Sequence, residues 1–181
     1  IVWVDDLCVA SSTERIFSEF FAAFKATFNS TTDKMKRTSF VGIEEEVVRK
    51  LDQNTLTIKQ TKYFEKVAKR FLSLPNTKEW KTPVATSRDE IQKFMAITCA
   101  QTDDERSAMA GKDFLGLMGA LLYASCMTRP DISFHCGYLC QFMQDPSPQA
   151  YDAALGVLSY LVTTKDLGIT YGGMERACAE P

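Results

Sequence analysis

The stretch Ile1-Val2-Trp3-Val4-Asp5-Asp6-Leu7-Cys8-Val9-Ala10 places two adjacent aspartates between two short apolar runs. Such runs, separated by two turn-forming residues, predict a tight β-hairpin with Asp5 and Asp6 at its tip. Two adjacent carboxylates repel each other unless a cation lies between them, and Mg²⁺ prefers oxygen ligands of this kind. Two Mg²⁺ ions can clamp the oxygens of a phosphoryl transfer. The hairpin is a candidate polymerase metal site, although acidic turns are also common on solvated surfaces.

Composition narrows the class of protein. The chain has 181 residues, a hydrophobic fraction of 45%, a charged fraction of 24% and a net charge of −2, which is ordinary for a globular protein. Any contact with nucleic acid must therefore come from local basic patches. No apolar run is long enough to span a bilayer, and the N-terminus lacks a signal-peptide pattern. The six cysteines form no CxxC pair, so we expect buried, reduced thiols in an intracellular protein that is not secreted.

Two further segments are expected to build the sheet and its cover. Ser11 and Glu14 fit a capping box before a helix with a phenylalanine stripe, which we expect to pack against the back of the hairpin. Residues 39–49 predict a strand with Gly42 inside it, and an internal glycine indicates a bulge or a close backbone approach. A turn at 52–55 and a returning strand at 56–60 complete a second hairpin.

A basic helix is predicted from Thr61 to Leu74. One face of the helix is apolar, and four cations cluster on another face: Lys62, Lys66, Lys69 and Arg70. These cations could follow a phosphate backbone, or they could be a solvated face. The pattern alone leaves both interpretations open.

The C-terminal third predicts helices. A short helix is expected around residues 90–100, and an apolar helix from about Phe114 ends at Thr128-Arg129-Pro130-Asp131, where another helix begins and runs to Met143. Ser147 is expected to cap a third helix, and residues 168–171 form a last strand. The predicted fold class is α+β, with antiparallel hairpins packed on helices and then a mostly helical subdomain.

The order of motifs resembles the reverse transcriptases of copia-type (Pseudoviridae) retrotransposons. Residues 3–11 resemble that family's YVDDLLVAS segment, residues 40–44 its FLGIEI strand, and residues 59–63 its SQxKYI segment. Residues 82–83 match its TP element, residues 117–123 resemble LIGSLLYL, and residues 128–134 match TRPDISF. Residues 142–147 and 166–169 are similar to RFMxxPS and DLGI. The resemblance covers nearly the whole chain in the same order.

The resemblance implies a division of the chain and a set of site residues. Residues 1–60 would be the C-terminal half of a polymerase palm, residues 61–165 a helical thumb or connection region, and residues 166–181 the possible start of a ribonuclease H domain or a tail. Asp5 and Asp6 would be catalytic and metal-binding carboxylates. Phe40, Val41 and Gly42 would form the primer grip. The nucleic-acid-binding residues would be the four cations of the basic helix, Lys62, Lys66, Lys69 and Arg70.

The resemblance also implies a reaction and partners. The intact protein would be an RNA-directed DNA polymerase that uses two Mg²⁺ ions to add deoxynucleotides to the 3′-hydroxyl of a template–primer. Its partners would include the N-terminal fingers and palm and a ribonuclease H domain of the same polyprotein. We expect no membrane contact, and a location in a cytoplasmic particle or the nucleus.

Two departures from the family pattern affect the expected activity. Trp3 stands where the family has tyrosine, and the family's other catalytic aspartate would lie before residue 1. We therefore expect this chain alone to be inactive as a polymerase. The alternative is a non-catalytic remnant of such an element that binds nucleic acid or a protein.

Overall fold

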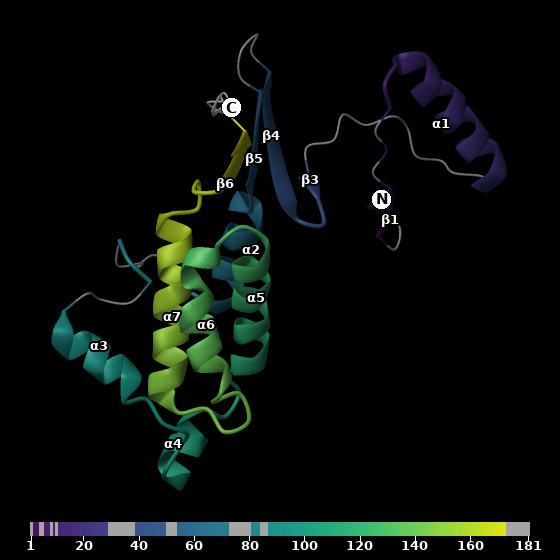
Figure 1. Ribbon diagram of the computed structural model, residues 1–181. Helices are drawn as coiled ribbons and strands as arrows, with labels where there is room; N and C mark the ends of the chain where they lie inside the picture. The colour runs from purple at the N-terminus through teal and green to yellow at the C-terminus, as the bar shows by residue number, and fades with distance from the viewer. Residues whose placement is uncertain are drawn as a thin grey trace, which may run out of the picture. The chain divides into compact units, whose positions relative to one another are not determined.

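A computed structural model describes residues 2–3, 6–7, 9, 11–28, 39–49, 54–72, 81–83 and 87–172 of the chain (Figure 1). At residues 2, 3, 6, 7, 39, 40, 49 and 54 it describes the backbone alone. The chain divides into two compact units, Ile1–Val41 and Gly42–Pro181. The strands that follow Gly42 belong to the same compact unit as the helices. The subdomain boundary expected after residue 60 stays a prediction.

The first unit contains the acidic hairpin. Strands β1 (Val2–Trp3) and β2 (Asp6–Leu7) pair antiparallel, with Val2 opposite Leu7 and Trp3 opposite Asp6. The predicted hairpin is therefore present, but Asp6 lies within a strand and not at the tip. Asp5 lies outside the described residues. This unit also contains α1 (Glu14–Phe28) and the short strand β3 (Ser39–Phe40).

Helix α1 begins two residues later than predicted. The backbone N–H of Ile16 donates to Oγ1 of Thr13 at 3.4 Å, while the hydroxyl of Ser11 donates to the carbonyl oxygen of Thr13 at 3.0 Å. The N-cap is therefore Thr13 and not Ser11. The helix starts at Glu14, and the side chain of Thr13, the residue before that start, supplies the acceptor for the N–H of Ile16, the third helical residue.

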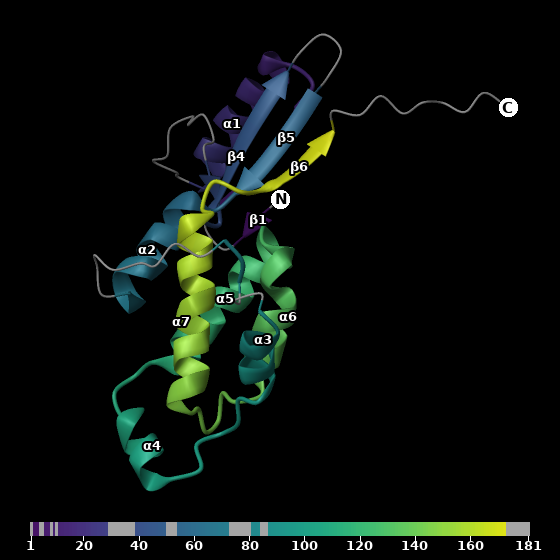
Figure 2. The same cartoon turned by 90° about the vertical axis from the view of Figure 1, so that its left-hand side faces the viewer.

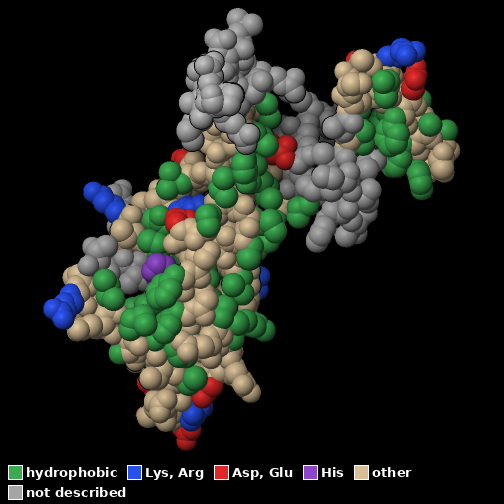
Figure 3. Space-filling view, in the orientation of Figure 1, with side chains coloured by type: hydrophobic (Ala, Val, Ile, Leu, Met, Phe, Trp, Pro, Cys, Tyr) green, Lys and Arg blue, Asp and Glu red, His purple; other side chains and the backbone are tan. Residues whose placement is uncertain are grey.

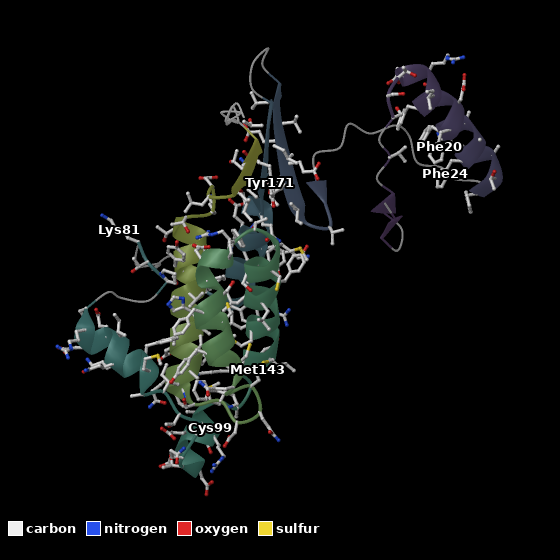
Figure 4. The ribbon with its side chains drawn as sticks, viewed as in Figure 1. Phe20, Phe24, Lys81, Cys99, Met143 and Tyr171 are labelled. Carbon is white, nitrogen blue, oxygen red and sulfur yellow. The ribbon has the colours of Figure 1, made fainter. Side chains whose placement is uncertain are left out.

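The phenylalanines of α1 form a ladder along one side of the helix. Rings of Phe17 and Phe21 stack with centroids 6.0 Å apart, and those of Phe20 and Phe24 with centroids 6.1 Å apart (Figure 4). Although we expected these rings to be core, no residue of α1 is buried in the described structure, and Phe28 is 69% exposed. The side chains of the hairpin strands β1 and β2, which these rings were expected to pack against, lie outside the described residues.

The second unit opens with a three-stranded antiparallel sheet. Strands β4 (Ile43–Arg49), β5 (Asn54–Lys59) and β6 (Ile169–Gly172) lie in that order, with Glu45 opposite Ile58 and Ile58 opposite Ile169. The returning strand predicted at 56–60 is confirmed. So is the last strand, which joins the sheet from the far end of the sequence.

Gly42 lies in a turn before β4 and not inside a strand. Val41 and Gly42 both have positive φ angles, 51° and 74°. Two successive residues of this kind are the pattern of a two-residue type I′ turn, in which glycine is favoured because it has no Cβ. The bulge expected from the sequence is therefore a turn that ends the short strand β3 and begins β4.

Four helices stand side by side below the sheet (Figures 1 and 2). They are α2 (Thr61–Phe71), α5 (Phe114–Met127), α6 (Ser133–Cys140) and α7 (Pro148–Thr163). The 3₁₀ turn η1 (Pro130–Ile132) joins α5 to α6, and two outlying helices, α3 (Arg88–Met95) and α4 (Asp103–Ala108), precede α5. The core lies between the four helices and includes Phe64, Leu117, Met118, Leu121, Ile132, Leu139, Leu158 and Leu161. The α+β class is confirmed.

One helix start agrees with its predicted cap, whereas three helices end earlier than predicted. Ser147 caps α7 as predicted, since its Oγ accepts from the backbone N–H of Ala150 at 3.3 Å. Helix α6 ends at Cys140, three residues before the predicted end. Helix α2 ends at Phe71, also three residues early, and the predicted helix around 90–100 is α3, which ends at Met95.

Helix α5 is apolar on its outer side as well as its inner side. It carries no charged residue, and Leu115 is 63% exposed. Figure 3 shows hydrophobic side chains over this part of the bundle, with charged groups mainly at its edges. An apolar helix of this kind is normally enclosed by other elements. The exposed outer side of α5 is therefore an apolar surface.

Candidate nucleic-acid interface

The basic helix α2 is amphipathic in the way that the sequence predicts. Phe64, Val67 and Ala68 are buried against the bundle, whereas the four predicted cations are exposed. Lys69 and Arg70 lie in the last turn, where positive charge complements the helix dipole. The apolar face therefore fixes which way the basic face points.

Three lysines form the free part of this surface. Lys62, Lys66 and Lys69 lie at helical spacing, and none of them pairs with an acidic side chain within the part of the chain that the structure describes. We call these three residues the lysine stripe. The acid beside them, Glu65, is held by Nζ of Lys165 at 2.5 Å. The hydrogen bond from Lys165 and then its charge lower the pKa of Glu65, and the charges of Lys69 and Lys62 lower it further by smaller amounts. Lys165 is thus the main partner of this carboxylate.

The fourth predicted cation has a structural role. Nη2 of Arg70 lies 2.5 Å from Oδ2 of Asp113, and Oδ1 of Asp113 accepts from the backbone N–H of Gly116 at 2.8 Å. Asp113 is the N-cap of α5, so the ion pair joins the end of α2 to the start of α5. The structure thus separates Arg70 from the lysine stripe by giving it a partner.

The turn at Gly42 lies close to the same helix. The backbone N–H of Lys62 donates to Oε1 of Glu44 at 2.7 Å, which ties the start of α2 to β4. A Cβ built on Gly42 would lie 3.9 Å from the hydroxyl oxygen of Tyr123 on α5. The structure therefore places Gly42, one residue of the predicted primer grip, near α5, and bonds the following strand β4 to the start of α2. The side chain of Phe40 lies outside what the structure describes.

Tyr63 of α2 and Tyr123 of α5 form a pair that the sequence analysis did not predict. The rings of Tyr63 and Tyr123 meet edge to face with centroids 5.1 Å apart, and the Tyr63 hydroxyl donates to the carbonyl oxygen of Ala120 at 3.4 Å. Burial raises the pKa of both phenols, so both stay protonated at neutral pH. Both lie in segments that carry the family resemblance, but residue type and spacing alone gave them no role.

The motif Thr128-Arg129-Pro130-Asp131 is a structural clamp. The Arg129 side chain is 2% exposed; its Nε and Nη2 donate to Asp131 at 3.0 and 2.8 Å, and its Nη1 donates to the carbonyl oxygen of Thr164 at 3.0 Å. Burial opposes ionisation of Asp131, but hydrogen bonds from Arg129 and Tyr160 lower its pKa overall. Arg129 is thus paired inside the protein and does not add to the basic surface of α2.

The predicted metal site is described only in part. The backbone of Asp6 lies in β2, and its side chain and Asp5 are outside the described structure. Among the described residues, no group of three or more His, Cys, Asp or Glu side chains could hold a metal ion. A hollow of about 640 Å³ between α3 and α7 is lined by other residues, such as Phe94 and Asp152, and includes none of the predicted site. No helix in the described ranges has the length and apolar character needed to cross a membrane.

Comparison with known proteins gives relatives along almost the entire chain. The Retrovirus-related Pol polyprotein from transposon TNT 1-94 of Nicotiana tabacum is 27% identical over 175 residues, which are 97% of this chain and 13% of that polyprotein. The Pol polyprotein from transposon RE2 of Arabidopsis thaliana is 27% identical over 93% of this chain and 10% of its own length. An uncharacterized mitochondrial protein of Arabidopsis thaliana is 27% identical over 91% of this chain and 61% of its own length.

The relatives show that the chain matches a small part of much longer polyproteins. No protein-family model and no solved structure matches the chain. The chain spans about an eighth of the first relative's length, so the activity of a whole polyprotein does not follow from the match. The chain is homologous to the Pol polyproteins of copia-type retrotransposons and corresponds to one segment of such a polyprotein.

Proposed function

We propose that this chain is the part of an RNA-directed DNA polymerase that holds the template–primer, and that the lysine stripe of α2 contacts its phosphate backbone. The observation that carries the proposal is the set of three exposed lysines without acidic partners among the described residues, on a helix whose first turn is bonded to β4. Lysines spaced along one helical face can follow successive phosphates. Homology to Pol polyproteins supports nucleic acid as the partner.

The acidic hairpin would contribute to the catalytic centre of the intact enzyme. Asp5 and Asp6 have the carboxylate chemistry that Mg²⁺ prefers, and β1 and β2 form the hairpin that would present them. Two carboxylates are fewer ligands than octahedral Mg²⁺ needs, so water, nucleotide phosphates or other protein segments would supply the rest. Bound Mg²⁺ would neutralise the charge that develops on the transferred phosphate. The part that falls to this chain is to hold the primer strand in place.

The experiment is fluorescence anisotropy of a labelled RNA–DNA primer–template with the purified chain, from about 50 to 200 mM salt. We expect the Lys62→Ala/Lys66→Ala/Lys69→Ala variant to weaken binding and to reduce the slope of log affinity against log salt by up to about three. The matched control removes three cations elsewhere, Lys81→Ala/Arg88→Ala/Lys93→Ala. It should change the slope little, and Arg70→Ala should fall between the two variants because its charge is partly compensated by Asp113.

Two results would contradict the proposal. One is wild-type binding that does not depend on salt, which would favour the non-catalytic alternative of a protein-binding remnant. The other is an equal effect of the stripe variant and its control, which would show that binding depends on the net charge of the chain and not on the lysine stripe. Adding Mg²⁺, and repeating the titration with Asp5→Asn/Asp6→Asn, tests the hairpin separately. Metal-dependent affinity that the double variant loses would support metal binding at the two aspartates.

A further inference from the structure

A pair of tyrosines joins α2, the helix that carries the lysine stripe, to α5. Tyr63 follows Lys62 in sequence, and its ring meets that of Tyr123 with centroids 5.1 Å apart. Tyr63 is anchored to α5 by its hydrogen bond to the carbonyl oxygen of Ala120. The pair therefore connects the start of the basic helix to the outer side of α5.

The hydroxyl of Tyr123 is the group that faces the turn. Gly42 has a φ of 74°, and a Cβ added to it would meet the Tyr123 oxygen at 3.9 Å, its closest contact. From the other side, Glu44 accepts from the backbone N–H of Lys62 at 2.7 Å. Glu44 of β4 is thus bonded to the start of α2, and Gly42, the residue before β4, lies near the Tyr123 hydroxyl of α5.

We propose that Tyr123 is a positioning residue that holds the Gly42 turn beside the lysine stripe, so that one nucleic-acid strand contacts both. The inference deepens the proposed function and rests on it. Tyr123 does not need to touch nucleic acid for this role, because it acts through the placement of Gly42. A strand bound at the stripe then meets a turn with no side chain at Gly42, where a sugar–phosphate backbone can approach closely.

The test compares two variants that each remove one hydroxyl. Tyr123→Phe deletes the oxygen that faces Gly42 and keeps the ring contact with Tyr63. Tyr63→Phe deletes the oxygen that bonds Ala120 and keeps the same ring contact, so it is the matched control. Both are measured in the whole 181-residue chain, with circular dichroism to show that the helical content is unchanged.

Two readouts separate placement of the turn from binding. In ¹⁵N–¹H spectra without nucleic acid, we expect the Gly42 amide resonance to move in Tyr123→Phe and to stay in Tyr63→Phe. In the anisotropy titration, Tyr123→Phe should raise the Kd about 3- to 10-fold, the order of effect of removing one polar contact, and leave the salt slope unchanged. Tyr63→Phe should bind as wild type does.

The inference is overturned if the Gly42 resonance responds equally to the two variants, or if Tyr123→Phe binds as tightly as wild type. If the wild-type chain does not bind the duplex at all, the proposed function and the nucleic-acid part of this inference both fail. The Gly42 resonance then still decides whether Tyr123 holds the turn. A double-mutant cycle between Gly42→Ala and Tyr123→Phe gives a second measure, since the two changes should be non-additive only if the residues are coupled.

Discussion

The hydroxyl of Thr128 donates a hydrogen bond of 2.8 Å to Oε1 of Gln60, across 68 residues of sequence. Both side chains are almost completely buried, and Nε2 of Gln60 has no partner within the described part of the chain. Gln60 lies where β5 passes into α2, and Thr128 lies where α5 ends. One buried hydrogen bond therefore links the sheet-to-helix junction to the end of the most apolar helix.

Removing this hydrogen bond should lower stability measurably. Thr128→Val keeps the shape of the side chain but leaves Oε1 of Gln60 buried without a donor, which we expect to cost about 1–3 kcal/mol of unfolding free energy. Urea denaturation of the two chains measures the difference. Thr128→Ser retains the hydroxyl and should recover most of the loss. A valine variant as stable as the wild-type chain would show that the hydrogen bond does not contribute.

The buried guanidinium of Arg129 should be worth more than a surface arginine. Arg129→Met leaves the carbonyl oxygen of Thr164 and one side of Asp131 without donors. Because the Asp131 side chain is 38% exposed and water can partly replace the arginine, we expect a loss of about 2–4 kcal/mol, toward the low end for a broken buried pair. Arg129→Lys should not restore stability, since an ammonium cannot make both parallel bonds.

The control for this prediction is Arg106, which has two acidic partners at the surface. Arg106 pairs with Asp103 at 3.1 Å and with Asp145 at 3.2 Å, and its side chain is 48% exposed. Arg106→Met should cost clearly less stability than Arg129→Met in the same denaturation experiment, because its ion pairs are exposed to solvent. Similar losses for Arg106→Met and Arg129→Met would contradict the clamp.

How far the sequence predicts this structure depends on whether a signal is local. The cap at Ser147 and the apolar face of α2 follow from residue types at fixed spacing, and both are confirmed. The partners of Arg70 and Arg129 could not be predicted in the same way. Asp113 and Thr164 come from distant segments, and only packing decides that these arginines are paired while the lysine stripe has no acidic partner among the described residues. The turn at Gly42 was mistaken for a bulge because both use glycine.

His135 should make stability depend on pH. Burial lowers its pKa and the charge of Asp131 opposes this; its ring meets the rings of Phe94 and Phe134 with centroids 5.5 Å away in each case. The folded pKa lies below the unfolded value of about 6.5, so the unfolded chain binds the proton more readily. Unfolding free energy should fall as pH decreases from about 6.5 through the folded pKa.

The pH measurement is direct because the chain has one histidine. Its C–H resonances should titrate below the value of the urea-unfolded chain in ¹H spectra. In His135→Phe, the part of the stability change that lies between these two pKa values should disappear. Titration of the folded histidine at or above the unfolded value would show that burial does not control it.

The thiols should react in an order set by burial. Burial first, and then the nearby Cys140, Cys126 and Asp131, raise the pKa of Cys136 to about 12, so its thiolate is scarce at neutral pH. Cys126 lies on the exposed side of α5. Because the thiolate is the reactive form, iodoacetamide at pH 8 should label Cys126 well before Cys136 in the folded chain. Peptide mapping by mass spectrometry follows the two sites, and in urea their rates should converge. Early labelling of Cys136 without urea would mean that α5 and α6 separate often enough to expose the core between them.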